Sequence, residues 1–214
     1  MDRFDVRLKK ALDDRPPQRV HVDGARRAAV LIPIVNGAEP ALIFTVRTDT
    51  LPSHKGQISF PGGSIDAVDD SPAAAALREA NEELGLDPRT VTILGELDSV
   101  PTFVSGYVIH PFVGWVEHRP ELRPNAAEVA EVLEVPVGGL VEDIRAAPGF
   151  AHNGRTFPTE AWIYNGRVIW GATARIVRVL LYRLSEAGLA ESPGESPGWP
   201  SWPDPLSEPA PWPS

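Results

Sequence analysis

The spacing of apolar residues predicts a chain that alternates strands and helices. Apolar side chains recur at helical intervals among charged ones, and we therefore expect helices over residues 2–14, 73–84 and 173–188, with a short one over 140–145. Runs rich in β-branched and aromatic residues predict strands over residues 28–35, 41–47, 56–60, 91–94, 107–117, 128–135, 157–164 and 167–170. Asn-Gly pairs between the first two and the last two strands predict two hairpins.

Three local predictions depend on residue type as well as on periodicity. Residues 128–135 fit the helical and the strand period in part, but their β-branched content and the following Pro136 favour a strand. Pro61-Gly62-Gly63 is expected to form a turn, because paired glycines allow backbone conformations that other residues avoid. Ser71 followed by Pro72 is typical of a helix start, and Gly85 is typical of a helix end.

The two ends of the chain differ from its middle. We expect residues 1–24 to form a helix and a loop, residues 25–188 to form the main domain, and residues 189–214 to be a tail. Residues 191–214 contain eight prolines and three of the six tryptophans without any periodicity, which indicates a disordered or polyproline-like segment. The tryptophans could dock on the domain or serve a partner, and the simpler reading is a dispensable extension.

Composition excludes several classes of protein. The chain has 214 residues, of which 43% are hydrophobic and 23% charged, as in an ordinary globular protein. A net charge of −9 argues against nucleic-acid binding, and the lack of cysteine excludes disulfides and thiolate zinc sites. No apolar run is long enough for a membrane span and the N-terminal residues show no secretory signal, so we expect a cytoplasmic protein without membrane contact.

Three glutamates near the end of the second predicted helix indicate a metal site. Glu79, Glu82 and Glu83 are spaced i, i+3, i+4 and therefore share one helix face, where their charges repel. They also lie near the helix C-terminus, where the helix dipole disfavours anions. A bound cation would remove both penalties, and Mg²⁺ prefers oxygen ligands of this kind.

The residues around these glutamates resemble a known signature. Gly63 and the later run Arg78-Glu79-Ala80-Asn81-Glu82-Glu83-Leu84-Gly85-Leu86 are similar to the Nudix box, G-x5-E-x7-R-E-U-x-E-E-x-G-U, where U is aliphatic. The first half departs from the pattern. Five residues separate Gly63 from Asp69, which stands where the pattern has glutamate, whereas counting back seven intervening residues from Arg78 reaches Asp70. One residue is therefore inserted, and the box acid is an aspartate.

The flanking segments resemble the coenzyme A pyrophosphatase branch of that family. Upstream lies Arg47-Thr48-x-x-Leu51-x-x-His54-x-Gly56-Gln57-x-x-Phe60-Pro61-Gly62-Gly63, and downstream lie Gly106-Tyr107-x-x-x-Pro111-x-x-Gly114, Asn125-x-x-Glu128-Val129 and Trp170-Gly171-x-Thr173-Ala174. The resemblance covers about residues 25 to 188. It implies an α/β protein, a Nudix-type α/β/α sandwich with a mixed sheet, that uses Mg²⁺ or Mn²⁺ to hydrolyse a small-molecule nucleotide substrate.

The resemblance also assigns roles to individual residues. It implies that Glu79, Glu82 and Glu83 bind the metal, together with a backbone carbonyl at the turn formed by Gly63. Arg78 would hold a box glutamate in place. The general base stays open between Glu82, Glu83 and Glu128, and Glu128 is equally compatible with a solvent-facing strand residue.

The segment before the glycines is the candidate substrate-binding region. Its candidates for contact with the phosphate-rich substrate are Arg47, His54, Lys55 and Gln57, and the alternative is a polar loop that only joins two strands. We expect the acidic residues 66, 69 and 70 to act as loop solvation or helix N-terminal charge. Tyr107 and Phe103 could line the leaving-group pocket but are better explained as core residues.

The expected reaction is hydrolysis of the pyrophosphate bond of coenzyme A or its derivatives, which gives 3′,5′-ADP and 4′-phosphopantetheine. One alternative is the same chemistry on ADP-ribose, NADH or a dNTP. A second alternative is a non-catalytic nucleotide-binding domain, against which the intact glutamates argue. A homodimer is suggested only by analogy with the family.

Overall fold

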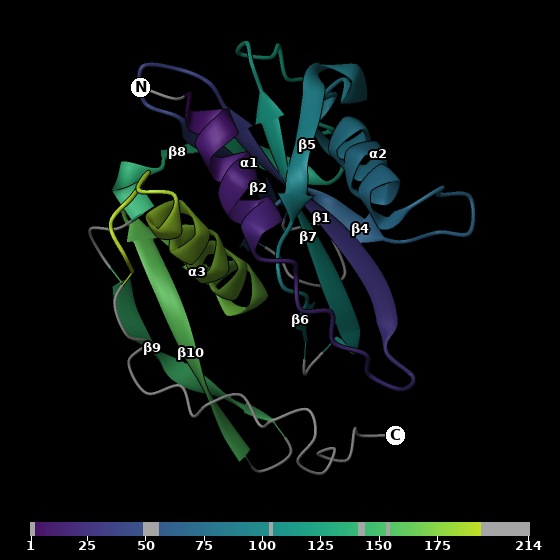
Figure 1. The fold of residues 1–214 in the computed structure, drawn as a ribbon. Helices are drawn as coiled ribbons and strands as arrows, with labels where there is room; N and C mark the ends of the chain where they lie inside the picture. Colours follow the sequence, from purple (N-terminus) through teal and green to yellow (C-terminus); the bar gives the residue numbers. More distant parts are fainter. Residues whose placement is uncertain (1–2, 49–55, 103–104, 141–143, 153–154, 194–214) are drawn as a thin grey trace.

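A computed structural model describes residues 3–48, 56–102, 105–140, 144–152 and 155–193, and Figure 1 shows their arrangement. The helices are α1 (Phe4–Asp14), α2 (Pro72–Leu84) and α3 (Gly171–Glu186), with 3-10 turns at Pro88–Thr90 and Gly138–Leu140. The strands are β1 (Arg26–Val35), β2 (Ala41–Arg47), β3 (Ile58–Ser59), β4 (Gly62–Ser64), β5 (Val91–Glu96), β6 (Val100–Pro101), β7 (Tyr107–Val116), β8 (Val129–Pro136), β9 (Ile144–His152), β10 (Arg155–Tyr164) and β11 (Arg167–Trp170).

The main sheet is mixed. Its central path runs β3-β2-β1-β7-β5, while β8 pairs with β2, β4 with β1 and β6 with β7. Strands β1 and β7 are parallel over their whole length, from Arg26 opposite Tyr107 to Val35 opposite Val116. The other pairs in this sheet are antiparallel. The short β1–β2 pairing at Ile34 and Leu42 confirms the first predicted hairpin.

Helices cover both faces of this sheet, which confirms the predicted α/β/α sandwich. Figure 1 shows α2 on one side of the sheet and α1 and α3 on the other. On the first side, α2 buries a row of small residues and one leucine against the sheet: Ala75, Ala76, Ala80 and Leu84. On the second side, α1 and α3 contribute Leu8, Leu12, Leu180 and Leu181 to a larger cluster. Burial of these apolar faces supplies the main stabilisation.

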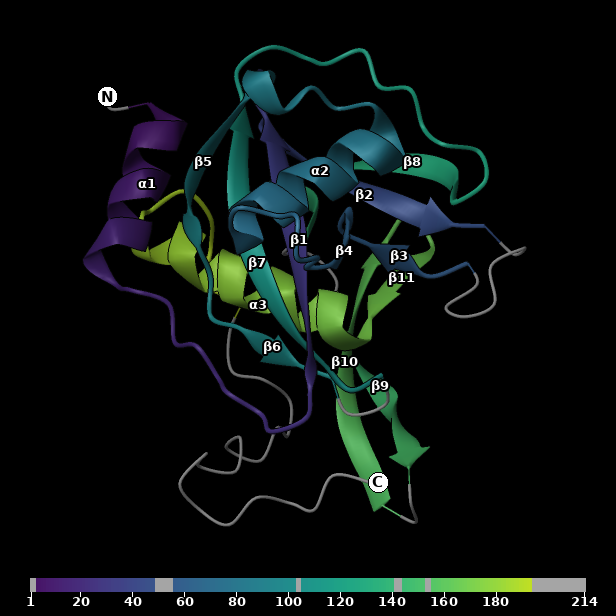
Figure 2. The same cartoon turned by 90° about the vertical axis from the view of Figure 1, so that its right-hand side faces the viewer.

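A second sheet, β11-β10-β9, extends the fold beyond the sandwich. Figure 2 shows its long β9–β10 hairpin projecting away from the main sheet. The hairpin predicted around Asn165-Gly166 is confirmed, because β10 pairs with β11 and both turn residues have positive φ, 48° and 75°. Such a pair of angles is typical of the turns that match strand twist.

Two local predictions are wrong. The short helix expected over 140–145 is absent from the described part of that range; residues 144–152 form β9, which pairs with β10. A six-residue helix is marginal by itself, and the strand ladder outweighs it. Gly62 and Gly63 lie in strand β4 instead of a turn, where a Cβ on Gly62 would come within 2.4 Å of the Ala29 carbonyl oxygen.

The ends of α2 agree with the sequence. The Ser71 side chain accepts a hydrogen bond from the Ala74 backbone N–H at 3.1 Å, and Pro72 opens the helix. Gly85 ends it with φ 67°, and its N–H donates to the Asn81 carbonyl. These caps set which residues occupy the final turn.

No helix among the described residues is both long and apolar enough to cross a membrane.

Candidate metal and catalytic site

The acid-bearing end of α2 packs closely on strand β4. A Cβ on Gly63 would lie 2.5 Å from the Glu79 carboxyl group, so the Glu79 side chain in its present position occupies space that the glycine leaves open. Gly63 is paired with Ala29 in the sheet, which holds it in place. The sequence therefore brings a helix carboxylate against a strand backbone by omitting a side chain.

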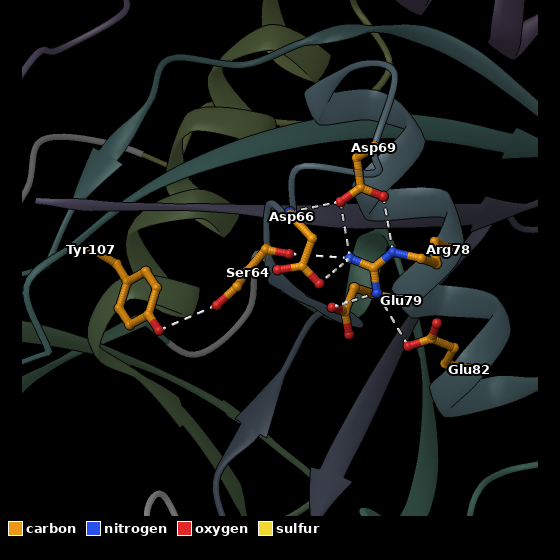
Figure 3. Close-up of polar contacts among 7 residues, drawn as sticks. All are labelled: Ser64, Asp66, Asp69, Arg78, Glu79, Glu82 and Tyr107. Atoms are coloured by element: carbon orange, nitrogen blue, oxygen red, sulfur yellow. Dashed lines mark hydrogen bonds and ion pairs between the residues drawn. The ribbon is translucent and has the colours of Figure 1, made fainter.

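Arg78 organises the carboxylates around it, as Figure 3 shows. Its Nε and Nη2 donate to the two oxygens of Asp69 at 2.9 and 3.1 Å, and Nη2 also donates to the Ser64 carbonyl at 3.2 Å. Its Nη1 donates to Glu79 at 3.0 Å and to Glu82 at 3.2 Å. Because one side of the guanidinium is anchored on Asp69, its other side is aimed at the two glutamates.

The role of Asp69 differs from our expectation. Its side chain is 4% exposed and pairs with Arg78 at two atoms, so it is not a solvated loop charge. The hydrogen bonds from Arg78 hold the pKa of this carboxyl below its usual range. The five-residue count from Gly63 is the signal that selects Asp69 over Asp70. Asp66 lies farther from Arg78, at 3.7 Å, and is exposed.

Glu83 is the most buried of the helix glutamates. It is 4% exposed, and its Oε2 has no hydrogen-bond partner among the described residues. Burial and, next, the Glu79 charge raise the pKa of Glu83 to about 7, although the Arg47 charge and a hydrogen bond from the Gly62 backbone oppose the shift. Burial also raises the pKa of Glu79. The site therefore holds more negative charge than its surroundings stabilise.

Glu128 joins this cluster from a different part of the chain. It lies just before β8, and its charge contributes to the raised pKa of both Glu79 and Glu83, after the contribution of burial. The segment that carries it is attached to the end of α2, because the Asn125 N–H donates to the Glu83 carbonyl at 2.8 Å. The acid outside the helix thus shares one electrostatic environment with the helix acids.

The candidate substrate-binding residues are only partly described. Arg47 ends β2, has an electrostatic influence on Glu83, and keeps a buried Nε without a partner among the described residues. Its N–H donates to the Gln57 carbonyl at 3.0 Å, so Gln57 is adjacent. His54 and Lys55 lie outside the described residues, as does Phe103. Tyr107 is only half-buried, with the Arg26 guanidinium 4.1 Å above its ring and its hydroxyl 3.3 Å from the Ser64 hydroxyl.

The residues present fit a hard divalent cation. Within the described ranges no three acidic or histidine side chains converge closely enough to enclose one. Arg78 instead holds Glu79 and Glu82, and Glu82 is 55% exposed. Nevertheless, the available ligands are carboxylate oxygens, and a cation would relieve their mutual repulsion. One of them, Glu83 Oε2, is buried and has no hydrogen-bond partner in the part of the chain that the structure describes. Arg78 uses only one oxygen of Glu79 and one oxygen of Glu82, so the second oxygen of each carboxylate is left for the cation.

Comparison with known proteins assigns this site to a family. A model of the NUDIX domain matches residues 25–155, which include every acid discussed above. The chain belongs to the Nudix hydrolase family. Relatives named "Uncharacterized Nudix hydrolase NudL" occur in Cronobacter sakazakii, 38% identical over 188 residues (87% of this chain, 95% of theirs), and in Photorhabdus laumondii, 37% identical over 181 residues (84% and 93%).

A solved structure supports the fold alone. The MutT/nudix family protein from Enterococcus faecalis has a TM-score of 0.53 and 11% identity, covering 85% of this chain and 69% of that one. As a Nudix hydrolase, the protein is a pyrophosphohydrolase, and this family generally uses divalent metals such as Mg²⁺ or Mn²⁺.

Replacing Asp69 tests the anchor of Arg78. We expect D69N to lower the rate at which the protein hydrolyses the pyrophosphate bond of its substrate by about 10- to 100-fold. Losing a group that orients metal ligands typically lowers activity by this factor. D69E retains a carboxylate and should recover most of the rate, whereas the exposed neighbour Asp70 provides the control D70N. Steady-state kinetics of the three variants make the comparison. Equal rates for D69N and the parent protein would contradict the assignment.

The raised pKa of Glu83 predicts how stability depends on pH without metal. The folded protein binds this proton more tightly than the unfolded chain, so the free energy of unfolding should fall as the pH rises from about 4.5 to about 7. The loss attributable to Glu83 is on the order of 3 kcal/mol. E83Q should remove this loss and be more stable than the parent above pH 7, as measured by denaturant unfolding in EDTA. The exposed E121Q is the control, and an E83Q protein with the parent's pH dependence would refute the prediction.

Proposed function

We propose that this Nudix hydrolase cleaves the pyrophosphate bond of coenzyme A or its derivatives and releases 3′,5′-ADP and 4′-phosphopantetheine. The observation that carries the proposal is the segment from Arg47 to Gly63, with its coenzyme A-type signature. The described part of this segment borders the acid cluster, since Arg47 acts electrostatically on Glu83. Residues of this segment that lie next to the acid cluster can influence which pyrophosphate-containing substrate is bound.

In this proposal Glu79, Glu82 and Glu83 hold Mg²⁺ or Mn²⁺, with the backbone carbonyl of Gly63 as a further ligand. A divalent cation held there would supply neutralisation of phosphate charge and would make a water molecule more acidic. Arg78 keeps its anchor on Asp69 and orients the glutamates. Glu83 is buried and has little contact with water, so the electrostatic interactions of its carboxylate are stronger than those of an exposed one.

The remaining roles concern the substrate and the attacking water. Arg47 supplies a positive charge for a phosphate oxygen, and its buried side-chain Nε has no hydrogen-bond partner among the described residues. We assign His54, Lys55 and Gln57 to the same phosphate-rich region on the basis of the signature. Glu128 stands outside the metal-binding helix and is our preferred general base, because a base must reach the water while the helix acids hold the cation. Residues 25–188 form the catalytic unit in this proposal, and most of the predicted tail, residues 194–214, lies outside the described residues.

A substrate comparison tests the choice of coenzyme A. The purified protein is assayed with Mg²⁺ and with Mn²⁺ on coenzyme A, ADP-ribose, NADH and dNTPs, and products are identified by chromatography. We expect the highest kcat/KM for coenzyme A or an acyl derivative, with 3′,5′-ADP among the products. Cleavage of another nucleoside diphosphate derivative in preference to coenzyme A would overturn the substrate assignment while retaining the reaction class.

Replacing the helix carboxylates tests their part in the reaction. We expect E82Q and E83Q to lower kcat by about 10²- to 10⁴-fold, as for loss of a metal ligand or general base. Thermal unfolding should stay cooperative, because glutamine has nearly the same volume as glutamate. Glu121, whose side chain is 81% exposed, provides the matched control E121Q. Near-parental rates for both helix variants would eliminate the metal assignment.

A further inference from the structure

The loop that precedes β8 is attached directly to the acid-bearing turn of α2. The Arg123 N–H donates to the Leu84 carbonyl at 2.7 Å, and the Asn125 N–H donates to the Glu83 carbonyl at 2.8 Å. Carbonyls in the last turn of a helix lack partners within the helix, so this loop supplies them. The position of the loop is therefore set by the same turn that carries the glutamates.

Asn125 uses every polar group that it has. Its backbone carbonyl accepts from the Glu128 N–H at 2.9 Å and from the Val129 N–H at 2.8 Å. Its side-chain oxygen accepts from the Ala127 N–H at 3.1 Å, while its side-chain nitrogen donates to the Glu128 carboxylate at 3.3 Å. The oxygen thus shapes the turn, and the nitrogen holds the acid, so the two functions reside on different atoms.

Glu128 is also held from the opposite side. The Thr48 N–H donates to the Glu128 carbonyl at 3.0 Å, and the next residue, Val129, is paired with Arg47 in the sheet. The backbone of Glu128 is therefore fixed between the end of β2 and the end of α2. The backbone contacts leave only the side-chain torsions of Glu128 free. The side-chain amide of Asn125 restricts these torsions, because it donates to the Glu128 carboxylate.

We propose that Asn125 is a positioning residue that orients the carboxylate of Glu128 toward the glutamates of α2. This inference rests on the proposed role of Glu128 as the general base and adds a requirement for its geometry. Before substrate binds, the donor nitrogen limits the rotamers of a glutamate that would otherwise sample solvent. Preorganisation of this kind raises kcat because the reacting group need not be ordered during the reaction.

The substitution N125D separates the two side-chain functions. Aspartate keeps the oxygen that accepts from Ala127 and keeps the backbone bond to Glu83, but it replaces the donor to Glu128 with an acceptor. We expect kcat to fall about 10- to 100-fold, with KM and the unfolding temperature close to those of the parent and with no weakening of Mn²⁺ affinity, since the new charge is negative. The matched control is R123A, because Arg123 contacts α2 through its backbone while its side chain is 78% exposed.

A double-mutant cycle with E128A completes the test. If Asn125 acts through Glu128, N125D should lower kcat no further in the E128A background. An N125D protein with parental kcat, an equal additional loss in E128A, or a weakened Mn²⁺ affinity would each overturn the inference. A parental kcat for E128A would instead remove Glu128 from the mechanism, and an absence of hydrolysis of any substrate by the parent would refute the proposed function, so the failures are distinguishable.

Discussion

The close packing of α2 on the main sheet is the constraint on which the candidate site depends. It brings Glu79 and Glu83 into a space largely withdrawn from water, and burial raises the pKa of both. Carboxylates that remain ionised under these conditions need compensating positive charge. Arg78 supplies part of this positive charge. The negative charge that Arg78 does not neutralise is what makes the remaining carboxylate oxygens suitable for a divalent cation.

Small side chains make that packing close enough. Three alanines on the inner face of α2 let the helix approach the sheet, and Gly63 provides the space into which the Glu79 carboxyl group extends. Gly62 allows β4 to lie against β1 for the same reason. The glycines therefore act by the absence of a side chain at a contact, which explains why they occur in a strand. A side chain at Gly62 would clash with the backbone of β1, and one at Gly63 would compete with the Glu79 carboxyl group for the same space.

Three segments that are distant in the chain meet at the end of this helix. They are the end of β2 with Arg47, the loop with Asn125 and Glu128, and the last turn of α2. Two backbone hydrogen bonds connect the loop to the helix, from Arg123 to Leu84 and from Asn125 to Glu83. Sequence changes in the exposed part of the loop are therefore compatible with a constant position of Glu128.

Local features of the chain were sufficient to predict the two caps of α2, the turn at Asn165-Gly166 and the alternation of most strands, because each depends on residues a few positions apart. The family and the set of box residues followed from their spacing for the same reason. Strand β9 and the strand conformation of Gly62 depend on pairing with distant segments, so local preference gave the wrong answer there. Only the tertiary structure decided that Asp69 anchors Arg78 and that Glu128 shares the field of Glu79 and Glu83, since packing of separate segments brings those charges together.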